Sequence, residues 1–94
     1  MSNNIVIITR HAGLVEWLKR RGIEGEIIAH ATAQDVEGKF VYGALPLHLA
    51  ALALGVATID MPRLTPELRG QDLSPEQMDD AGAELAQYAV QRIG

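Results

Sequence analysis

The stretch Ile5-Val6-Ile7-Ile8-Thr9-Arg10-His11-Ala12-Gly13 decides the fold that this sequence predicts. Its first four residues form a short apolar run, which is typical of a buried strand. The amphipathic segment 14–18 follows at once and predicts a helix. In open α/β sheets, ligands bind at the carboxyl ends of the strands. We therefore expect Arg10 and His11 to stand at the mouth of a binding site.

The alternation of strand and helix continues along the chain. Strands are predicted over 4–9, 26–30, 39–43 and 56–60, and helices over 13–22, over 47–54 and from residue 75 onward, with a single helical turn within 32–38. The last helix is expected to bury one face, formed by Met78, Ala81, Leu85, Tyr88 and Ala89. This pattern predicts the α/β class: a single small Rossmann-like domain over residues 1–94, with a mostly parallel four-stranded sheet flanked by helices.

The expected strand order is 2-1-3-4, with right-handed crossovers. This order brings the carboxyl ends of the first and third strands together, so that Arg10 and His11 would lie beside residues 43–48. The segment 61–73 is a long loop for so small a domain, and loops of that length are usually functional or mobile.

Composition restricts the classes of function. The chain has 94 residues, of which 48% are hydrophobic, and a domain this small gains stability from oligomerisation. A net charge of −4 argues against a long nucleic acid as ligand, although a compact anion stays possible. The sequence has no cysteine, no apolar run that could span a bilayer and no basic segment before its first apolar run. We therefore expect a cytoplasmic protein without a membrane partner.

Arg10 and His11 are the first candidates for chemistry. Histidine exchanges protons near neutral pH, and arginine offers phosphate a planar set of donors. The alternatives are a turn histidine that only bonds the backbone, and an ion pair between Arg10 and Glu16 or Asp60.

His48 is the third catalytic candidate. It lies in the first turn of the helix predicted over 47–54, whose positive end disfavours an imidazolium and keeps the ring neutral, as a general base requires. The alternative is a partly buried histidine with satisfied hydrogen bonds. For His30, at the end of the second strand, a structural role is expected. The three histidines lack the spacing of metal ligands, so no metal site is predicted.

Five further residues are expected to contact a ligand: Thr9, Gly13, Gly43, Arg69 and Gly70. The first two glycines allow special backbone geometry or the close approach of a ligand. The pair at 69–70 could fold over a ligand as a lid. By contrast, Trp17 is expected in the core, Arg63 carries only a weak expectation of ligand contact, and the basic run 19–21 is expected in solvent.

The Arg10-His11-x-Gly13 pattern resembles the start of the histidine phosphatase superfamily. There the histidine becomes phosphorylated, and arginines bind the phosphoryl group. That superfamily has Arg-His-Gly, whereas Ala12 intervenes here, and its fold needs a longer chain. A phosphomonoesterase is therefore kept only as the less favoured alternative.

Three motifs together resemble a small family of type III CRISPR accessory proteins in order, spacing and total length. They are Thr9-Arg10-His11-x-Gly13-x-x-Glu16-Trp17, Gly43-x-Leu45-Pro46-x-His48-Leu49-Ala50 and Leu68-Arg69-Gly70-x-x-Leu73. Members of that family are understood to be ring nucleases or related binders of cyclic oligoadenylate.

The resemblance implies a ring nuclease that linearises cyclic oligoadenylate, with cyclic tetra-adenylate as the expected ring, and so switches off type III CRISPR antiviral signalling. The reaction would need no metal or cofactor, because the substrate's own 2′-hydroxyl attacks. The resemblance points to Arg10, His11, His48 and Arg69 as catalytic or ligand-contacting residues. A homodimer would match a two-fold symmetric ring. The alternative from another class is a protein that sequesters the same ligand without cutting it.

Overall fold

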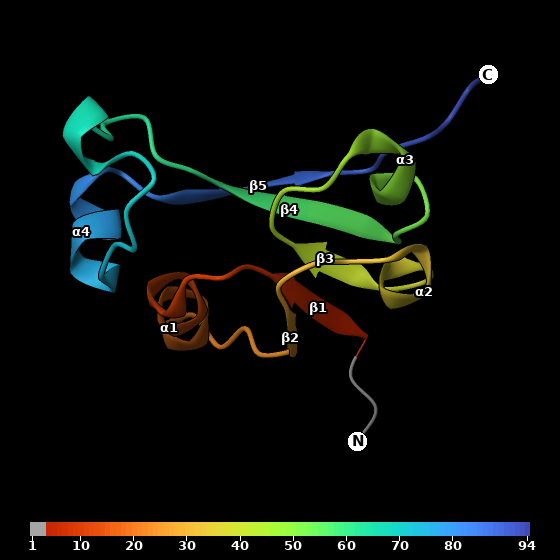
Figure 1. Cartoon of the computed structure of the whole chain (residues 1–94), viewed down its shortest axis with the longest axis horizontal. Helices are drawn as coiled ribbons and strands as arrows, with labels where there is room; N and C mark the ends of the chain where they lie inside the picture. The colour runs from red at the N-terminus through yellow and green to blue at the C-terminus, as the bar shows by residue number, and fades with distance from the viewer. Residues whose placement is uncertain (1–3) are drawn as a thin grey trace.

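The computed structural model describes residues 4–94, which form a mixed five-stranded sheet with helices on both faces (Figure 1). The strands are β1 (Ile5–Ile8), β2 (Glu26–Ile28), β3 (Phe40–Tyr42), β4 (Gly55–Asp60) and β5 (Glu84–Tyr88). The helices are α1 (Ala12–Arg20), α2 (Ala33–Val36), α3 (Leu47–Ala50) and α4 (Pro75–Asp80), with a 3₁₀ turn η1 (Pro66–Leu68). The sheet order is β2-β1-β3-β4-β5, so the predicted order of the first four strands is confirmed.

Two rows of apolar side chains across β1, β3 and β4 hold the layers together. The strand register aligns Val6–Val41–Val56 in one row and Ile7–Tyr42–Ala57 in the other. Every one of the six is at most 8% exposed. Because successive residues of a strand point to opposite faces, the valine row packs with α2 and α3, and the other row packs with α1 and α4.

The prediction of a mostly parallel four-stranded sheet is wrong, because a fifth strand pairs antiparallel with β4. Five residue pairs join β5 to β4, from Val56–Tyr88 to Asp60–Glu84. The predicted long final helix therefore ends at Asp80. Gly82 adopts φ +83, and the amide groups of Gly82 and Ala83 donate to carbonyl groups of the last turn, which is a glycine-terminated helix end.

The helix predicted over 47–54 is also shorter than expected, since α3 ends at Ala50. Beyond it the chain turns, and its backbone pairs with the residues that lead into β3. The Leu54 amide donates to the Lys39 carbonyl at 2.7 Å, and the Gly38 amide donates to the Leu52 carbonyl at 3.2 Å. These bonds set the position at which β4 begins.

Among residues 4–94, no helix has the length and apolar character needed to cross a membrane.

Helices α1 and α4 are joined by a polar and aromatic contact. Trp17 is buried, as predicted, and its Nε1 donates to Asp79 Oδ1 at 2.9 Å. The Arg21 guanidinium lies 3.5 Å from the Trp17 ring centroid and pairs with the same Asp79. Arg20 pairs with two carboxylates: its Nε lies 3.5 Å from Oε2 of Glu16, and its Nη1 lies 2.9 Å from Oε2 of Glu76. The basic run 19–21 is therefore not simply solvated, because two of its members tie the helices together.

The Arg20–Glu76 pair predicts a pH dependence of stability. Donation by Arg20 lowers the pKa of Glu76 in the folded protein. A carboxyl whose folded pKa is depressed stabilises the fold above its unfolded pKa and loses that effect as the pH falls through the folded pKa. We expect Glu76→Gln to lower the free energy of unfolding slightly at pH 7, because both side chains are exposed, and to have no effect well below about pH 4.

Urea unfolding at pH 7, 5 and 3 would measure this difference, with Glu67→Gln on the exposed turn η1 as the matched control. An equal destabilisation at all three values of pH would show that the pair does not act electrostatically.

Candidate functional site

The end of β1 fixes His11 at the junction between strand and helix. The Thr9 amide donates to the Ile28 carbonyl at 3.0 Å, and the Thr9 hydroxyl accepts from the His11 amide at 3.0 Å. His11 is the N-cap of α1, and its carbonyl accepts from the Val15 amide at 3.4 Å. The predicted ligand residue Thr9 thus positions the predicted catalytic residue His11.

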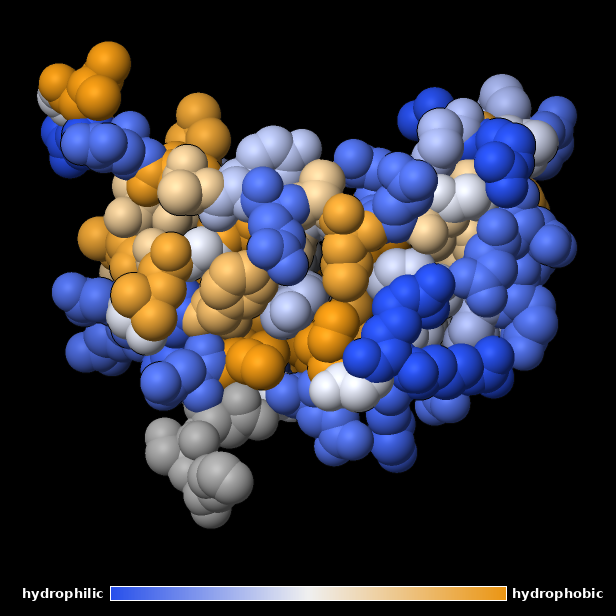
Figure 2. Space-filling view, turned by 180° about the vertical axis from the view of Figure 1, so that it is seen from behind, coloured by the Kyte–Doolittle hydropathy of each residue, from blue (hydrophilic) through white to orange (hydrophobic). Residues whose placement is uncertain are grey.

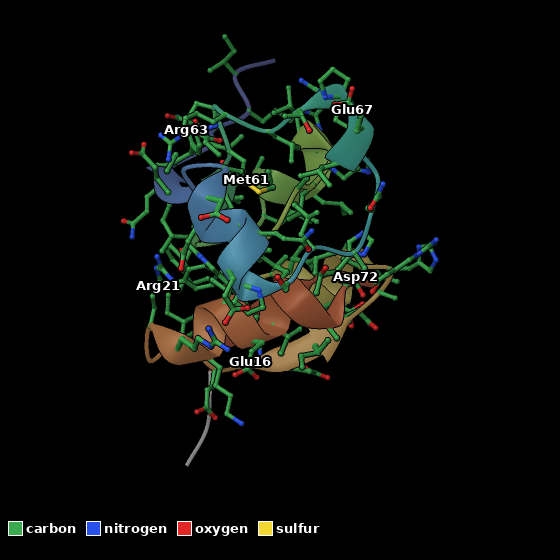
Figure 3. The ribbon with its side chains drawn as sticks, turned by 90° about the vertical axis from the view of Figure 1, so that its left-hand side faces the viewer. Glu16, Arg21, Met61, Arg63, Glu67 and Asp72 are labelled. Carbon is green, nitrogen blue, oxygen red and sulfur yellow. The ribbon has the colours of Figure 1, made fainter. Side chains whose placement is uncertain are left out.

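Gly13 allows the loop before α4 to reach the start of α1. A Cβ at this position would overlap the carbonyl oxygen of Leu73. The Gly13 amide donates to Asp72 Oδ1 at 3.4 Å, across 59 residues of sequence. Figure 3 shows Asp72 at one end of α1 and Arg21 at the other. The close approach foreseen for Gly13 is therefore made by the chain itself.

The same contact places a carboxylate beside the candidate catalytic histidine. Oδ1 of Asp72 lies 3.8 Å from Nδ1 of His11, and the two side chains are 54% and 51% exposed. This distance is too long for a hydrogen bond, but the negative charge of Asp72 on this side of the ring favours a proton on Nδ1 over one on Nε2. The arrangement can therefore favour His11 as a base while keeping it open to a ligand.

Arg10 lies against His30 rather than against a carboxylate. Its Nη2 donates to Nε2 of His30, from the end of β1 to the end of β2. Neither Glu16 nor Asp60, the two partners considered from the sequence, pairs with Arg10 within residues 4–94. The contact orients the guanidinium without neutralising it, so its charge stays available to an anion.

An apolar cavity of about 220 Å³ opens on one side of His11. Its walls come from the ends of β1 and β4, from α1 and α4, and from the 61–73 loop: Ile8, Leu14, Ile59, Met61, Leu73 and Met78. Figure 3 shows Met61 beside α4. The polar side chains of the lining are His11, Thr58 and Gln71. Gly43 and Ala44 complete it, so the predicted meeting of the first and third strand ends is confirmed.

A charged groove runs on the other side of His11. It is lined by Thr9, Arg10, His11, Ala12, Val15, Glu16, Lys19 and Ile27. His11 is shared between the groove and the apolar cavity. The groove contains two cations, Arg10 and Lys19, together with the His11 imidazole and one carboxylate, Glu16. Its cations outnumber its carboxylates, so it suits a phosphate even though the whole chain carries a net negative charge.

The family model described as "Putative CRISPR-associated protein (Cas_VVA1548)" matches residues 6–91. The match runs from β1 to beyond β5 and includes every residue of the apolar cavity and the charged groove. The chain belongs to this CRISPR-associated family. No curated protein and no solved structure matches it.

Several predicted site residues lie away from His11 in this family member. His48 is exposed on α3, on the opposite face of the sheet from α1, and it lines neither the cavity nor the groove. Because α3 has only four residues, the argument that a helix end keeps His48 neutral no longer applies. Arg69 and Gly70 are exposed after η1 and do not cover either hollow. Gly70 has φ +79, which marks a turn.

Polar residues that the structure adds to the site include Asp72, Gln71, Thr58, His30 and Lys19. The sequence flagged the 61–73 loop but could not show which of its residues reaches α1, because the contact depends on the approach of Leu73 to Gly13. Among residues 4–94, no three His, Asp or Glu side chains are grouped as a metal site would need.

Substitution of Gly13 tests the arrangement of the site. We expect Gly13→Ala to lower the free energy of unfolding by about 1–3 kcal/mol, because the added methyl overlaps the Leu73 carbonyl and must push the loop away. The matched control is Ala12→Ser, an exposed change one residue earlier in α1. Urea unfolding measures the loss, and the NMR shifts of His11 report whether Asp72 has moved. Wild-type stability and unchanged His11 shifts would contradict the close approach.

Proposed function

We propose that this protein binds a cyclic oligoadenylate, cyclic tetra-adenylate first of all, and opens its ring without a metal ion, ending a type III CRISPR antiviral signal. One observation carries the proposal: Arg10 and His11 stand together in the charged groove at the carboxyl end of β1, and His11 also lines the apolar cavity. Membership of a CRISPR-associated family and the three motifs of the sequence support the choice of ligand.

The proposed chemistry uses a nucleophile that the substrate itself carries. The 2′-oxygen attacks the adjacent phosphorus, and the bond from phosphorus to the 5′-oxygen breaks. The products are a 2′,3′-cyclic phosphate at one end and a 5′-hydroxyl at the other. His11, beside the Asp72 carboxylate, moves protons in this exchange, and Arg10 stabilises the charge on the phosphate. The protein also holds the attacking oxygen in line.

Sequestration without cleavage is the second candidate function. Ring opening needs a proton acceptor for the 2′-hydroxyl and a proton donor for the 5′-oxygen. Within the described lining of the two hollows, His11 is the one imidazole. A site with a single histidine between two subsites would also serve a protein that only holds the ring.

The deciding experiment incubates the purified protein with cyclic tetra-adenylate in excess chelator and follows the products by liquid chromatography and mass spectrometry. We expect linear adenylates that end in a 2′,3′-cyclic phosphate. His11→Ala should slow cleavage by about 100- to 10,000-fold. Gln34→Ala, an exposed change on α2 outside both hollows, is the control and should stay within a few-fold of wild type.

An intact ring that co-elutes with the protein would establish sequestration instead. An intact ring that does not bind would reject the ligand. Cleavage that the chelator abolishes and a divalent ion restores would reject the metal-free scheme.

We further propose that the protein acts as a homodimer. Large apolar side chains are exposed on α3, after it and on β5: Leu47, Leu52, Leu54 and Tyr88. Figure 2 shows hydrophobic residues gathered toward this side and charged residues toward the side of α1 and α4. The groove between α3 and β5 shares Ala44 and Thr58 with the apolar cavity. A two-fold contact here would bring two copies of the site near each other, as a symmetric ring requires.

The proposed dimer is tested by placing a charged side chain on the exposed apolar surface of α3. Leu47 is 76% exposed, so Leu47→Glu should not disturb the core, but it should give a monomer in sedimentation velocity at concentrations where the wild type is a dimer. Ile27→Glu, at 54% exposure on β2, is the matched control and should stay dimeric. A wild-type monomer, or a dimer unaffected by Leu47→Glu, would reject this interface.

A further inference from the structure

We propose that the apolar cavity beside His11 is a nucleobase pocket, and that Gln71 makes it selective for adenine. The inference rests on the proposed function for its ligand class, but not on ring opening. In this arrangement the two hollows hold different parts of one ligand. A base lies in the apolar cavity, and phosphates and riboses lie along the charged groove.

The size of the cavity supports one base rather than a whole ligand. Pockets that enclose drug-sized molecules hold about 300–1,000 Å³. At about 220 Å³ this cavity is smaller, and a ring of several nucleotides cannot enter it. A single planar base is the part of such a ring that suits an open, mostly apolar hollow of this size. Since His11 lines both hollows, a base in the cavity would leave its own phosphate near Arg10 and His11.

The walls have the chemistry that an aromatic ring prefers. Leu14 and Ile59 offer branched aliphatic surface, and Met61 and Met78 offer thioether sulfurs, which make favourable contacts with aromatic rings. No Asp, Glu, Lys or Arg belongs to the described lining, so a neutral base is favoured over a phosphate inside the cavity.

Gln71 supplies the selectivity. Its Nε2 donates to the backbone carbonyl of Glu67 at 2.6 Å, and a carbonyl can accept only from the amide nitrogen. This bond fixes which way the amide is turned, so that Oε1 can accept and the second N–H of Nε2 can donate, the pair of groups that matches the exocyclic amine and an adjacent ring nitrogen of adenine. Adenine carries an exocyclic amine that donates to such an oxygen. Hypoxanthine and guanine carry a carbonyl oxygen at the same ring position, which the Gln71 oxygen would repel.

The test compares adenosine 5′-monophosphate with inosine 5′-monophosphate, which differ at this ring position. Binding to the isotope-labelled wild-type protein is followed by NMR titration. We expect shifts at the amides of Leu14, Thr58 and Gln71, and about tenfold weaker binding of the inosine nucleotide. Gln71→Leu should remove the preference while leaving the thermal unfolding midpoint unchanged. Gln34→Leu, on exposed α2, is the matched control and should keep the preference.

Equal binding of the two nucleotides by the wild type, a preference that survives Gln71→Leu, or no shift at the cavity amides at millimolar nucleotide would overturn the inference. The outcome is separable from that of the proposed function. Selective adenine binding in a protein that never opens a ring supports the pocket and rejects the nuclease. Ring opening that is as fast for an inosine-substituted ring as for the adenosine ring supports the nuclease and rejects the selectivity.

Discussion

The burial of β1, β3 and β4 on both faces is the constraint on which the rest of this structure depends. The rows Val6–Val41–Val56 and Ile7–Tyr42–Ala57 leave no face of the central strands for solvent. Both faces therefore need helical cover, and the chain supplies it by crossing from one face to the other between parallel strands. The three strand ends that result lie at one edge of the sheet, and the apolar cavity and the charged groove open there.

A second constraint, the contact between Gly13 and Leu73, shapes the electrostatics of this edge. It brings the Asp72 carboxylate to the first turn of α1, where a helix attracts negative charge, and beside His11. The anionic ligand proposed above would therefore meet a helix end already occupied by Asp72 and would find its countercharge at Arg10 and Lys19. The proposed division of labour follows from this arrangement: phosphates lie toward the groove, a base enters the cavity, and His11 stands between them. The net charge of −4 does not oppose such a ligand, because the arginine and lysine are local to the groove.

The three motifs that carry the family resemblance differ in how many of their residues lie at the candidate site. The first motif holds the residues around which the site is built. The second contributes Gly43, whose φ of +132 and close packing on Ile8 let the end of β3 meet that of β1, but its His48 lies on the far side of the sheet. The third contributes Leu73 to the core, whereas Arg69 stays exposed. Each motif therefore contains residues with different structural roles. Only the three-dimensional structure separates residues that lie at the candidate site from residues that pack in the core.

Sequence patterns determined the α/β class and the burial of Trp17, because the apolar period acts over a few residues, and the alternation of strands and helices predicted the order of the first four strands. They could not determine β5. Residues 78–89 carry a helical apolar period, yet Gly82 stops α4, and the open edge of β4 recruits the segment as a strand in which Leu85 still packs on the core. Tertiary structure alone also decided that Asp72 lies beside His11, that Arg10 bonds to His30 and that His48 lies on the opposite face of the sheet from α1. Those contacts join residues far apart in the chain, and they depend on how closely two backbones approach, which no local pattern encodes.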